Sequence, residues 1–333
     1  MDNVMIRNYL VSFLTTADGG ETWELNLSSV GGWTAGKGWT FGDFNALQEE
    51  WLGLQRDGAN VLVSLGGESF NPGSTINEET VDELGKAIAY SFLGSTIPPT
   101  GPYADWTPLL AGFNFDGIDF DLEKSAGEAA SNEIWLSLVQ SIKKYKPSAY
   151  ITAAPQSPYL YNTNVESPFG VPFPGGVNET CGEISDPKDG EFLLSVSNIH
   201  LLDALNVQFY NQNGTSDFPT ESNFNTRICQ LVKLIQSGTE DPTTKIYVGV
   251  TDKDDGQNGN DGCETCNNAE DVGNAIKAAL ENAGGAVSSS WFGGVVGWES
   301  PNVNSFVDGI LSQLDGGEAG FYGYQKGDPG WGE

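Results

Sequence analysis

The stretch that decides the fold is Asp116-Gly-Ile-Asp119-Phe-Asp121-Leu-Glu123. On a β-strand, residues two apart face the same side, so Asp119, Asp121 and Glu123 share one face and the apolar residues between them share the other. The rise along a strand spaces the three carboxylates about 6–7 Å apart. This alternation predicts a strand whose apolar face packs against helices and whose acidic face lines the interior of a barrel.

Three ionised carboxylates in a packed interior are costly, and a fold does not require them. They must share protons, bind a metal or accept hydrogen bonds, and like charges this close raise the pKa of at least one of them. Glu123, at the mouth of the row, is then available as a proton donor near neutral pH. An exposed acidic strand is disfavoured by the apolar residues at alternate positions, whereas a magnesium site remains an alternative because hard cations bind carboxylates.

Short apolar runs alternate with amphipathic segments on both sides of this stretch, which is typical of parallel strands joined by crossover helices. We find seven such units without a composition break, and an eighth would close a (β/α)8 TIM barrel of about 250 residues. The sequence therefore predicts an α/β fold with a single domain over residues 1–333. The expected strands are Val4–Leu14, Val61–Leu65, Gly117–Leu122, Tyr150–Ala154, Ala204–Tyr210, Lys245–Val250 and Gly294–Trp298. The expected helices are Phe44–Arg56, Asn77–Leu93, Ser131–Lys146, Ser222–Ser237, Ala269–Asn282 and Pro301–Leu314.

The composition excludes several classes of function. Lys and Arg number 15 against 45 Asp and Glu, and the net charge of −30 repels phosphate backbones and anionic membranes, so we expect no nucleic-acid or membrane partner. No apolar run reaches the length of about 18 residues that a membrane span needs. His200 is the one histidine, which disfavours a Ser–His–Asp triad and a multi-histidine zinc site. The first residues, MDNVMIRNYLVSF, do not read as a secretory signal, which is absent or already removed.

The surplus length is expected in two loops, Ser157–Ile199 and Thr251–Asn268, and the second does not have the spacing of a calcium-binding hand. The cysteines are Cys181, Cys229, Cys263 and Cys266. The last two form half of a zinc-ribbon pattern without a second half, so we expect a surface disulfide or free thiols and no metal site. Glycosylation acceptors, relevant if the chain is secreted, occur at Asn26, Asn178 and Asn213.

DGIDFDLE resembles the DxxDxDxE signature of glycoside hydrolase family 18, the chitinases. Four further segments resemble family motifs in the family's order, nearest to the plant-type class III chitinases and lysozymes. They are Ser64-Leu-Gly66-Gly67, Ala153-Ala-Pro155-Gln156, Gln208-Phe-Tyr210-Asn211 and Gly294-Val-Val-Gly-Trp298.

The resemblance implies a role for each matched residue. Glu123, Asp121, Asp119 and Tyr210 would be catalytic, with Ser64 donating a hydrogen bond to Asp119. Sugar binding is implied for Phe13, Ser64, Gly66, Gly67, Gln156, Gln208, Asn211, Trp298 and Tyr322. Non-proline cis bonds are implied at Ser12-Phe13 and Trp298-Glu299. Trp33, Trp39, Trp106 and Trp291 are either sugar platforms at the rim or packing residues.

The order of the strands departs from the family. Asn8–Leu14 resembles the family's second strand, and the tail around Tyr322 resembles its first. We therefore hypothesise a circular permutation, in which the family's first strand comes last and pairs between Val4–Leu14 and the Trp298 strand. The alternative is a chain truncated at its start, with an unrelated tail. Cysteines that follow the matched motifs in plant-type members are absent here, which leaves substrate length open.

The resemblance implies a retaining, endo-acting chitinase that needs no cofactor and cleaves chitin or N-acetylglucosamine oligosaccharides. Glu123 would protonate the glycosidic oxygen, and the substrate's own acetamide oxygen would attack the anomeric carbon, an exception to the scheme with two catalytic carboxylates. Alternatives are an endo-β-N-acetylglucosaminidase acting on glycans and a catalytically weak chitin-binding lectin on the same fold. We expect a monomer in an extracellular or secretory location.

Overall fold

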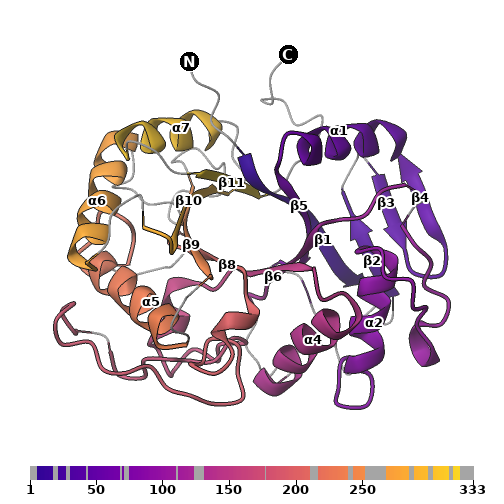
Figure 1. Cartoon of the computed structure of the whole chain (residues 1–333), viewed down its shortest axis with the longest axis horizontal. Coiled ribbons are helices and arrows are strands. Elements are labelled where there is room, and N and C mark those ends of the chain that lie inside the picture. The colour runs from indigo at the N-terminus through magenta and orange to yellow at the C-terminus, as the bar shows by residue number, and fades with distance from the viewer. Residues whose placement is uncertain are drawn as a thin grey trace.

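A ring of β-strands surrounded by helices dominates the structure, a computed structural model (Figure 1). It describes residues 6–17, 22–27, 31–42, 44–67, 70, 75–109, 112–123, 131–176, 178–210, 217–238, 243–251, 268–284, 289–298, 303–314 and 318–322. Among these residues, eight parallel strands form the ring. They are β1 (Ile6–Ala17), β5 (Asn60–Gly66), β6 (Gly117–Asp121), β7 (Tyr150–Ala153), β8 (Ala204–Gln208), β9 (Lys245–Val250), β10 (Phe292–Gly297) and β11 (Glu318–Tyr322).

The ring is completed by β11, the last strand of the described chain. It pairs in parallel with β10, where Val295 lies opposite Ala319, and with β1, where Leu10 lies opposite Tyr322. The remaining strands follow in the order β10-β9-β8-β7-β6-β5-β1. The predicted (β/α)8 barrel is thereby confirmed, and the tail strand lies between the two strands that the sequence analysis names. The circular permutation itself stays a prediction.

Alternation along the strands separates two hydrophobic cores. Ile118 and Phe120 of β6 point outward into the large core between strands and helices, as predicted from their position between the acids. Apolar side chains at inward positions form a smaller core inside the barrel. It consists of Leu10, Leu62, Ala154, Ala204, Tyr247 and Val296. Polar side chains share the inside of the barrel with this core, among them the buried Asp119 of β6, Thr152 of β7 and Asn206 of β8.

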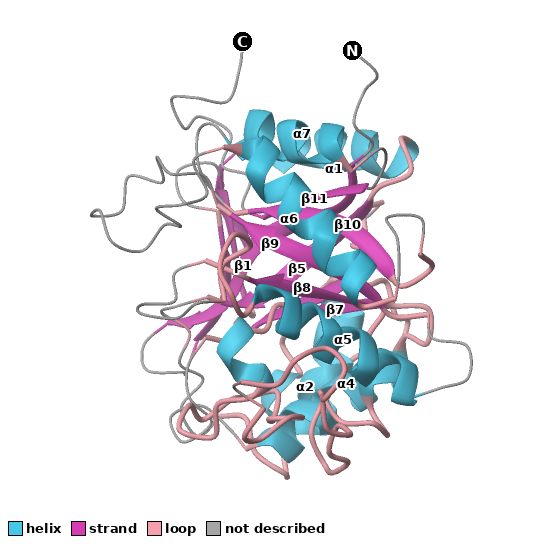
Figure 2. Cartoon of the chain, turned by 90° about the vertical axis from the view of Figure 1, so that its left-hand side faces the viewer, coloured by secondary structure: helices cyan, strands magenta, loops and turns pink. Residues whose placement is uncertain are grey.

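Helices cover the outside of the ring (Figures 1 and 2). They are α1 (Phe44–Arg56), α2 (Val81–Ser91), α4 (Asn132–Tyr145), α5 (Phe224–Gly238), α6 (Ala269–Asn282) and α7 (Val303–Gln313). Each lies within two residues of its predicted bounds, except α2, which begins four residues later than expected. The reason is a turn in which Asn77 Oδ1 accepts hydrogen bonds from the backbone N–H groups of Glu79 and Thr80 at 2.9 and 3.2 Å. Asparagine side chains compete in this way with helical hydrogen bonds.

A small antiparallel meander extends β1 beyond the barrel and was not predicted. Its strands are β2 (Thr22–Asn26), β3 (Gly31–Thr34) and β4 (Gly38–Gly42). Trp33 of β3 is fully buried, with its ring centroid 5.3 Å from that of Trp106 and 4.9 Å from that of Phe92. Trp106 and Trp291 are also buried, so these three tryptophans pack in cores, whereas Trp39 is half-buried.

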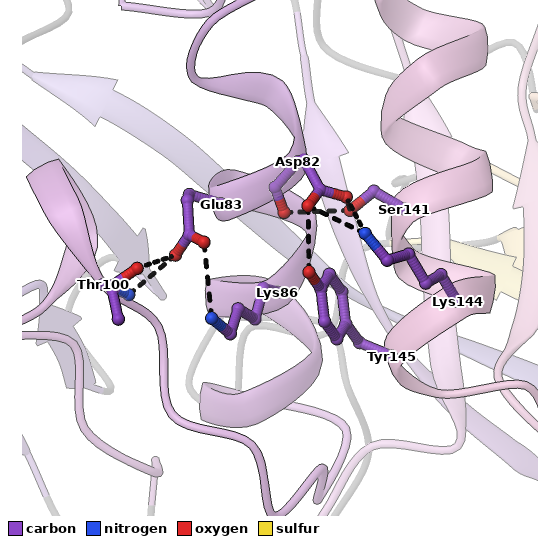
Figure 3. A network of polar contacts seen from close by, with 7 residues as sticks. All are labelled: Asp82, Glu83, Lys86, Thr100, Ser141, Lys144 and Tyr145. Atoms are coloured by element: carbon purple, nitrogen blue, oxygen red, sulfur yellow. Dashed lines mark hydrogen bonds and ion pairs between the residues drawn. The ribbon is translucent and has the colours of Figure 1, made fainter.

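Helices α2 and α4 are joined by a network of polar contacts (Figure 3). The carboxylate of Asp82 accepts hydrogen bonds from Lys144 Nζ at 2.9 Å, from the Tyr145 hydroxyl at 2.9 Å and from Ser141 Oγ at 3.0 Å. Burial alone raises the pKa of Asp82, but these hydrogen bonds and the Lys144 charge outweigh burial, and the pKa lies below its usual value. The interface is therefore strongest when Asp82 is ionised.

The long loop after β7 is tied to helix α5 by a disulfide between Cys181 and Cys229. Three short 3-10 turns occur in the described loops, η2 (Gly101–Tyr103), η3 (Ser157–Leu160) and η4 (Ile199–Leu201). The sequence alone does not predict how the cysteines pair. Cys263 and Cys266 lie outside the described residues, as does most of the loop Thr251–Asn268.

Candidate active site

The acidic row of β6 lies at the carboxyl ends of the barrel strands, where enzymes of this architecture carry their active sites. Asp119 and Asp121 are fully buried inside the barrel, and Glu123, two residues beyond them, is partly exposed. The predicted increase in exposure, from Asp119 and Asp121 in the interior to Glu123 at the mouth of the barrel, is confirmed.

Asp119 is held by three donors, from the two strands that pair with β6 and from β8, the strand beyond β7. Ser64 Oγ of β5 donates to Asp119 Oδ2 at 2.9 Å, as the resemblance implies. Thr152 Oγ1 of β7 and Asn206 Nδ2 of β8 both donate to Oδ1, the latter at 3.1 Å. Strand register explains the first two contacts, because Asp119 pairs directly with Ser64 on one side and with Thr152 on the other. Donors on all sides stabilise a buried carboxylate.

Asp121 is less completely paired than Asp119. Gln208 Nε2 donates to Asp121 Oδ1 at 2.7 Å, whereas Oδ2 is buried and makes no hydrogen bond of good geometry with the described residues. Burial, followed by the charges of Glu123 and Asp119, raises the pKa of Asp121 well above its usual value. The Glu123 side chain, which lies close enough to share a proton with Asp121, raises it further, and the hydrogen bond from Gln208 opposes this only in part. Asp121 therefore retains a proton at pH values where an exposed aspartate is ionised.

Gly66 lets β5 approach β6 closely beside Asp121. Gly66 has a φ of +132°, and a Cβ built on it would lie 1.9 Å from the carbonyl oxygen of Asp121. The next residue, Gly67, donates its backbone N–H to the same oxygen at 2.8 Å. A side chain at Gly66 would push the acidic strand away, so this glycine sets the position of Asp121.

Aromatic rings lie beside the acids. Tyr210, just after β8, stacks on Trp298, just after β10, with ring centroids 5.9 Å apart and an angle of 26°. Phe13 lies 6.0 Å from Trp298 and follows a cis peptide bond at Ser12-Phe13, as predicted. The Tyr210 hydroxyl is buried and makes no hydrogen bond with the described residues. Burial and the nearby acids, with Asp121 first, raise the pKa of Tyr210, so it remains a proton donor.

The remaining predicted site residues are less fully described. Gln156 is partly exposed and its backbone bridges to Gln208 at the same end of the barrel. Asn211 and the Trp298-Glu299 bond lie outside the described residues. For Tyr322, the structure describes the backbone pairing with Leu10 but not the side chain.

Sequence reasoning missed three residues of the site: Thr152, Asn206 and Tyr159. The Tyr159 hydroxyl donates to the backbone carbonyl of Glu123 at 3.1 Å. Thr152 and Asn206 could have been found as polar residues at inward positions of otherwise apolar strands. Tyr159 carries no such signal, since it lies in the turn η3, outside any periodic element.

Among the described residues, no group of three or more histidine, cysteine or acidic side chains has the arrangement of a metal site. Within the same residues, no helix combines the length and the apolar character that crossing a membrane requires.

No protein-family model matches this chain, and no curated protein matches it either. Solved structures do match. A GH18 chitinase from Pseudoalteromonas aurantia matches with a TM-score of 0.55 at 19% identity, covering 93% of this chain and 93% of that one. Concanavalin B matches with a TM-score of 0.57 at 15% identity, covering 92% and 90%. A xylanase and α-amylase inhibitor protein from Scadoxus multiflorus matches with a TM-score of 0.54 at 21% identity, covering 92% and 89%.

This chain therefore has the fold of family 18 chitinases. Because an inhibitor protein has the same fold, catalysis has to be argued from the site rather than from the fold.

Proposed function

We propose that this chain is a retaining, endo-acting chitinase of glycoside hydrolase family 18. The observation that carries the proposal is a pair of buried polar atoms, Asp121 Oδ2 and the Tyr210 hydroxyl, that make no good hydrogen bond with the described part of the chain. Buried polar atoms without partners cost free energy. A ligand that offers one N–H donor and one carbonyl acceptor side by side satisfies both, and the acetamido group of N-acetylglucosamine is such a ligand.

The proposed reaction uses this acetamido group as the nucleophile. Glu123 donates its proton to the glycosidic oxygen while the bond from that oxygen to the anomeric carbon breaks. The acetamide oxygen forms a new bond to the anomeric carbon, giving an oxazolinium ion. Asp121, in its ionised form, accepts the acetamide N–H and offsets the developing positive charge, and the Tyr210 hydroxyl donates to the acetamide oxygen. Water then attacks the anomeric carbon while the bond from that carbon to the acetamide oxygen breaks, and the water gives a proton to Glu123, which restores the acid with retained configuration.

The aromatic rings support the choice of a sugar substrate. Trp298 is partly exposed and lies between Tyr210 and Phe13. A flat indole at the strand ends fits the apolar face of a pyranose ring. In this proposal Trp298 is the floor of the subsite in which the acetamido group reacts, and the amides of Gln208 and Gln156 contribute polar contacts around it.

The decisive experiment is hydrolysis of a chitin hexamer followed by proton NMR of the first product. Release of β-anomers of shorter N-acetylglucosamine oligomers supports the proposal, and initial release of α-anomers contradicts substrate assistance. A cellulose hexamer is the matched control, because it lacks the acetamido group and should not react. Cleavage of a high-mannose glycopeptide alone would indicate an endo-β-N-acetylglucosaminidase, and chitin binding without cleavage would indicate a lectin.

We also propose that the chain acts as a monomer in an oxidising, secretory or extracellular compartment. The disulfide between Cys181 and Cys229 supports this location, because such bonds persist outside reducing cytosol. Asn178, one of the predicted glycosylation acceptors, is exposed. Loss of both cysteine thiols to alkylation in protein isolated from its natural source, without prior reduction, would contradict the proposed location.

A further inference from the structure

The turn η3 brings a buried tyrosine against the backbone of the proposed acid. Tyr159 follows β7 by six residues and is almost fully buried. Its hydroxyl donates to the carbonyl oxygen of Glu123 at 3.1 Å. Burial, and then the charges of Glu123 and Asp121, raise the pKa of Tyr159, so the phenol stays protonated and remains a hydrogen-bond donor. The hydroxyl thus contacts the residue whose side chain the proposed reaction depends on.

The turn itself is anchored by a buried ionic network outside the barrel. Asp217 accepts hydrogen bonds from Ser157 Oγ at 3.2 Å and from the Tyr161 hydroxyl at 2.7 Å, residues on either side of Tyr159. Arg227 of α5 pairs with Asp217 at 3.2 Å, and its guanidinium lies 3.7 Å from the centre of the Tyr161 ring. Both charged side chains are fully buried.

Arg227 also ties this network to the loop before α5 and to α5 itself. A second guanidinium nitrogen of Arg227, Nη1, donates to the carbonyl oxygen of Gly176 at 3.1 Å and to Gln230 Oε1 at 2.6 Å. Removing one partner from a buried ion pair is strongly destabilising, so the groups keep a single arrangement. Tyr159 is therefore presented to Glu123 from a rigid support, with its ring also 6.2 Å from that of Phe169.

We propose that Tyr159 is a positioning residue for Glu123, holding the acid's backbone so that its carboxyl stays close to Asp121 and to the scissile bond. The inference rests on the proposed function and deepens it. Glu123 stands two residues beyond the end of β6, and the Tyr159 hydroxyl supplies a fixed contact to its backbone there. A misplacement of about 1 Å at a reacting group costs up to about 100-fold in rate.

The contact also bears on how the two acids titrate. The charge of Glu123 contributes to the raised pKa of Asp121, so the two carboxyls behave as a coupled pair. If Glu123 moves away, repulsion between the ionised forms weakens and the higher apparent pKa of the pair falls. The alkaline limb of the pH profile for kcat/KM then moves to lower pH.

The experiment compares Tyr159→Phe with Tyr103→Phe as a matched control. Tyr103 is also buried and donates its hydroxyl to a backbone carbonyl, that of Thr75, at 3.2 Å, but it lies in η2 and contacts none of the proposed site. Both variants should lose similar stability in urea. Only Tyr159→Phe should lower kcat on the chitin hexamer, by about tenfold, with little change in KM.

In Tyr159→Phe, the alkaline limb of the pH profile for kcat/KM should also move to lower pH by about 0.5 unit, while that of Tyr103→Phe stays in place. Equal effects of the two variants on kcat and on the pH profile would overturn the proposal.

A second measurement needs no substrate and separates this inference from the proposed function. Carbon-13 NMR of labelled Asp and Glu side chains follows the titration of Asp121 and Glu123 in the free protein. In Tyr159→Phe the higher of the two apparent pKa values should fall, and in Tyr103→Phe it should not change. Unchanged titration in both variants refutes the positioning role. A shift in Tyr159→Phe, in a protein that cleaves no chitin oligomer, upholds the contact and refutes the chitinase assignment.

Discussion

Gln208 Nε2 donates a 2.7 Å hydrogen bond to Asp121 Oδ1 from the second strand along the barrel, and it is the one described contact that favours the ionised form of this buried acid. It orients Asp121 so that Oδ2, near the Glu123 side chain, makes no hydrogen bond of good geometry with the residues that the structure describes. In the proposed reaction this oxygen receives the acetamide N–H, so the amide of Gln208 determines which oxygen is available to the substrate.

Replacing Glu123 with glutamine should abolish proton donation while preserving the shape of the site. We expect kcat on the chitin hexamer to fall by about two to four orders of magnitude, the usual contribution of a general acid. Calorimetry should still detect binding of the oligomer. Glu133→Gln is the control, because Glu133 is exposed in the first turn of α4. Wild-type turnover in Glu123→Gln would refute the assignment of the acid.

Asp121→Asn should cost rate more than binding. Asparagine keeps the hydrogen bond from Gln208 but lacks the charge that offsets the oxazolinium ion, so we expect kcat to fall by about 10²–10³-fold. The dissociation constant of the oligomer should change by less than about tenfold, since a neutral side chain fits the same space. A larger effect on binding than on kcat would show that Asp121 acts mainly on the ground state.

Asp121→Asn should become more stable relative to the wild type as the pH rises. Burial raises the folded pKa of Asp121 above its unfolded value of about 3.9, so the folded protein holds a proton that the unfolded chain releases. Wild-type stability therefore declines with rising pH from the unfolded pKa towards the folded pKa, and Asp121→Asn escapes this decline. Urea unfolding should show the variant gaining on the wild type between pH 4 and 7, and a constant difference would contradict the raised pKa.

Gly66→Ala tests the close approach of β5 to β6. The added Cβ would lie 1.9 Å from the carbonyl oxygen of Asp121, and the φ of +132° is itself unfavourable for alanine. We expect a loss of more than about 3 kcal/mol in the free energy of unfolding or failure to fold. Gly38→Ala separates the two effects, because Gly38 also has a positive φ of +73° but its Cβ would meet nothing within 4 Å. It should cost about 1 kcal/mol.

Asp82→Asn should destabilise the protein at neutral pH, and the effect should become smaller in acid. Hydrogen bonds and the Lys144 charge lower the folded pKa of Asp82 despite burial, so its stabilising effect is complete above the unfolded pKa of about 3.9 and is lost as the pH falls through the folded pKa. Because Asp82 is half exposed, the difference at pH 7 should be about 1 kcal/mol or less. Asp57→Asn, at an exposed position after α1, is the control. Urea unfolding of the two variants and the wild type at pH 7 and at pH 3 measures these differences.

The sequence alone predicted the features that depend on local periodicity. The two-residue repeat of a strand placed Asp119 and Asp121 inside the barrel with Phe120 outside it, and the alternation of strands and helices indicated the barrel. The turn before α2 and the meander β2–β4 were missed, because side-chain hydrogen bonds of Asn77 and antiparallel pairing to the end of β1 leave no periodic pattern. The motif resemblance supplied the hydrogen bond from Ser64 to Asp119.

What only the tertiary structure decided is which residues meet across the barrel. Asn206 reaches Asp119 over 87 positions of the chain, and Tyr159 reaches Glu123 from a turn whose place depends on the ion pair between Asp217 and Arg227. These contacts follow from the register of strands and the packing of loops, and both are set by many weak interactions distant in sequence. Alternation along one strand determines the face on which a side chain lies, whereas the closed ring determines its partner.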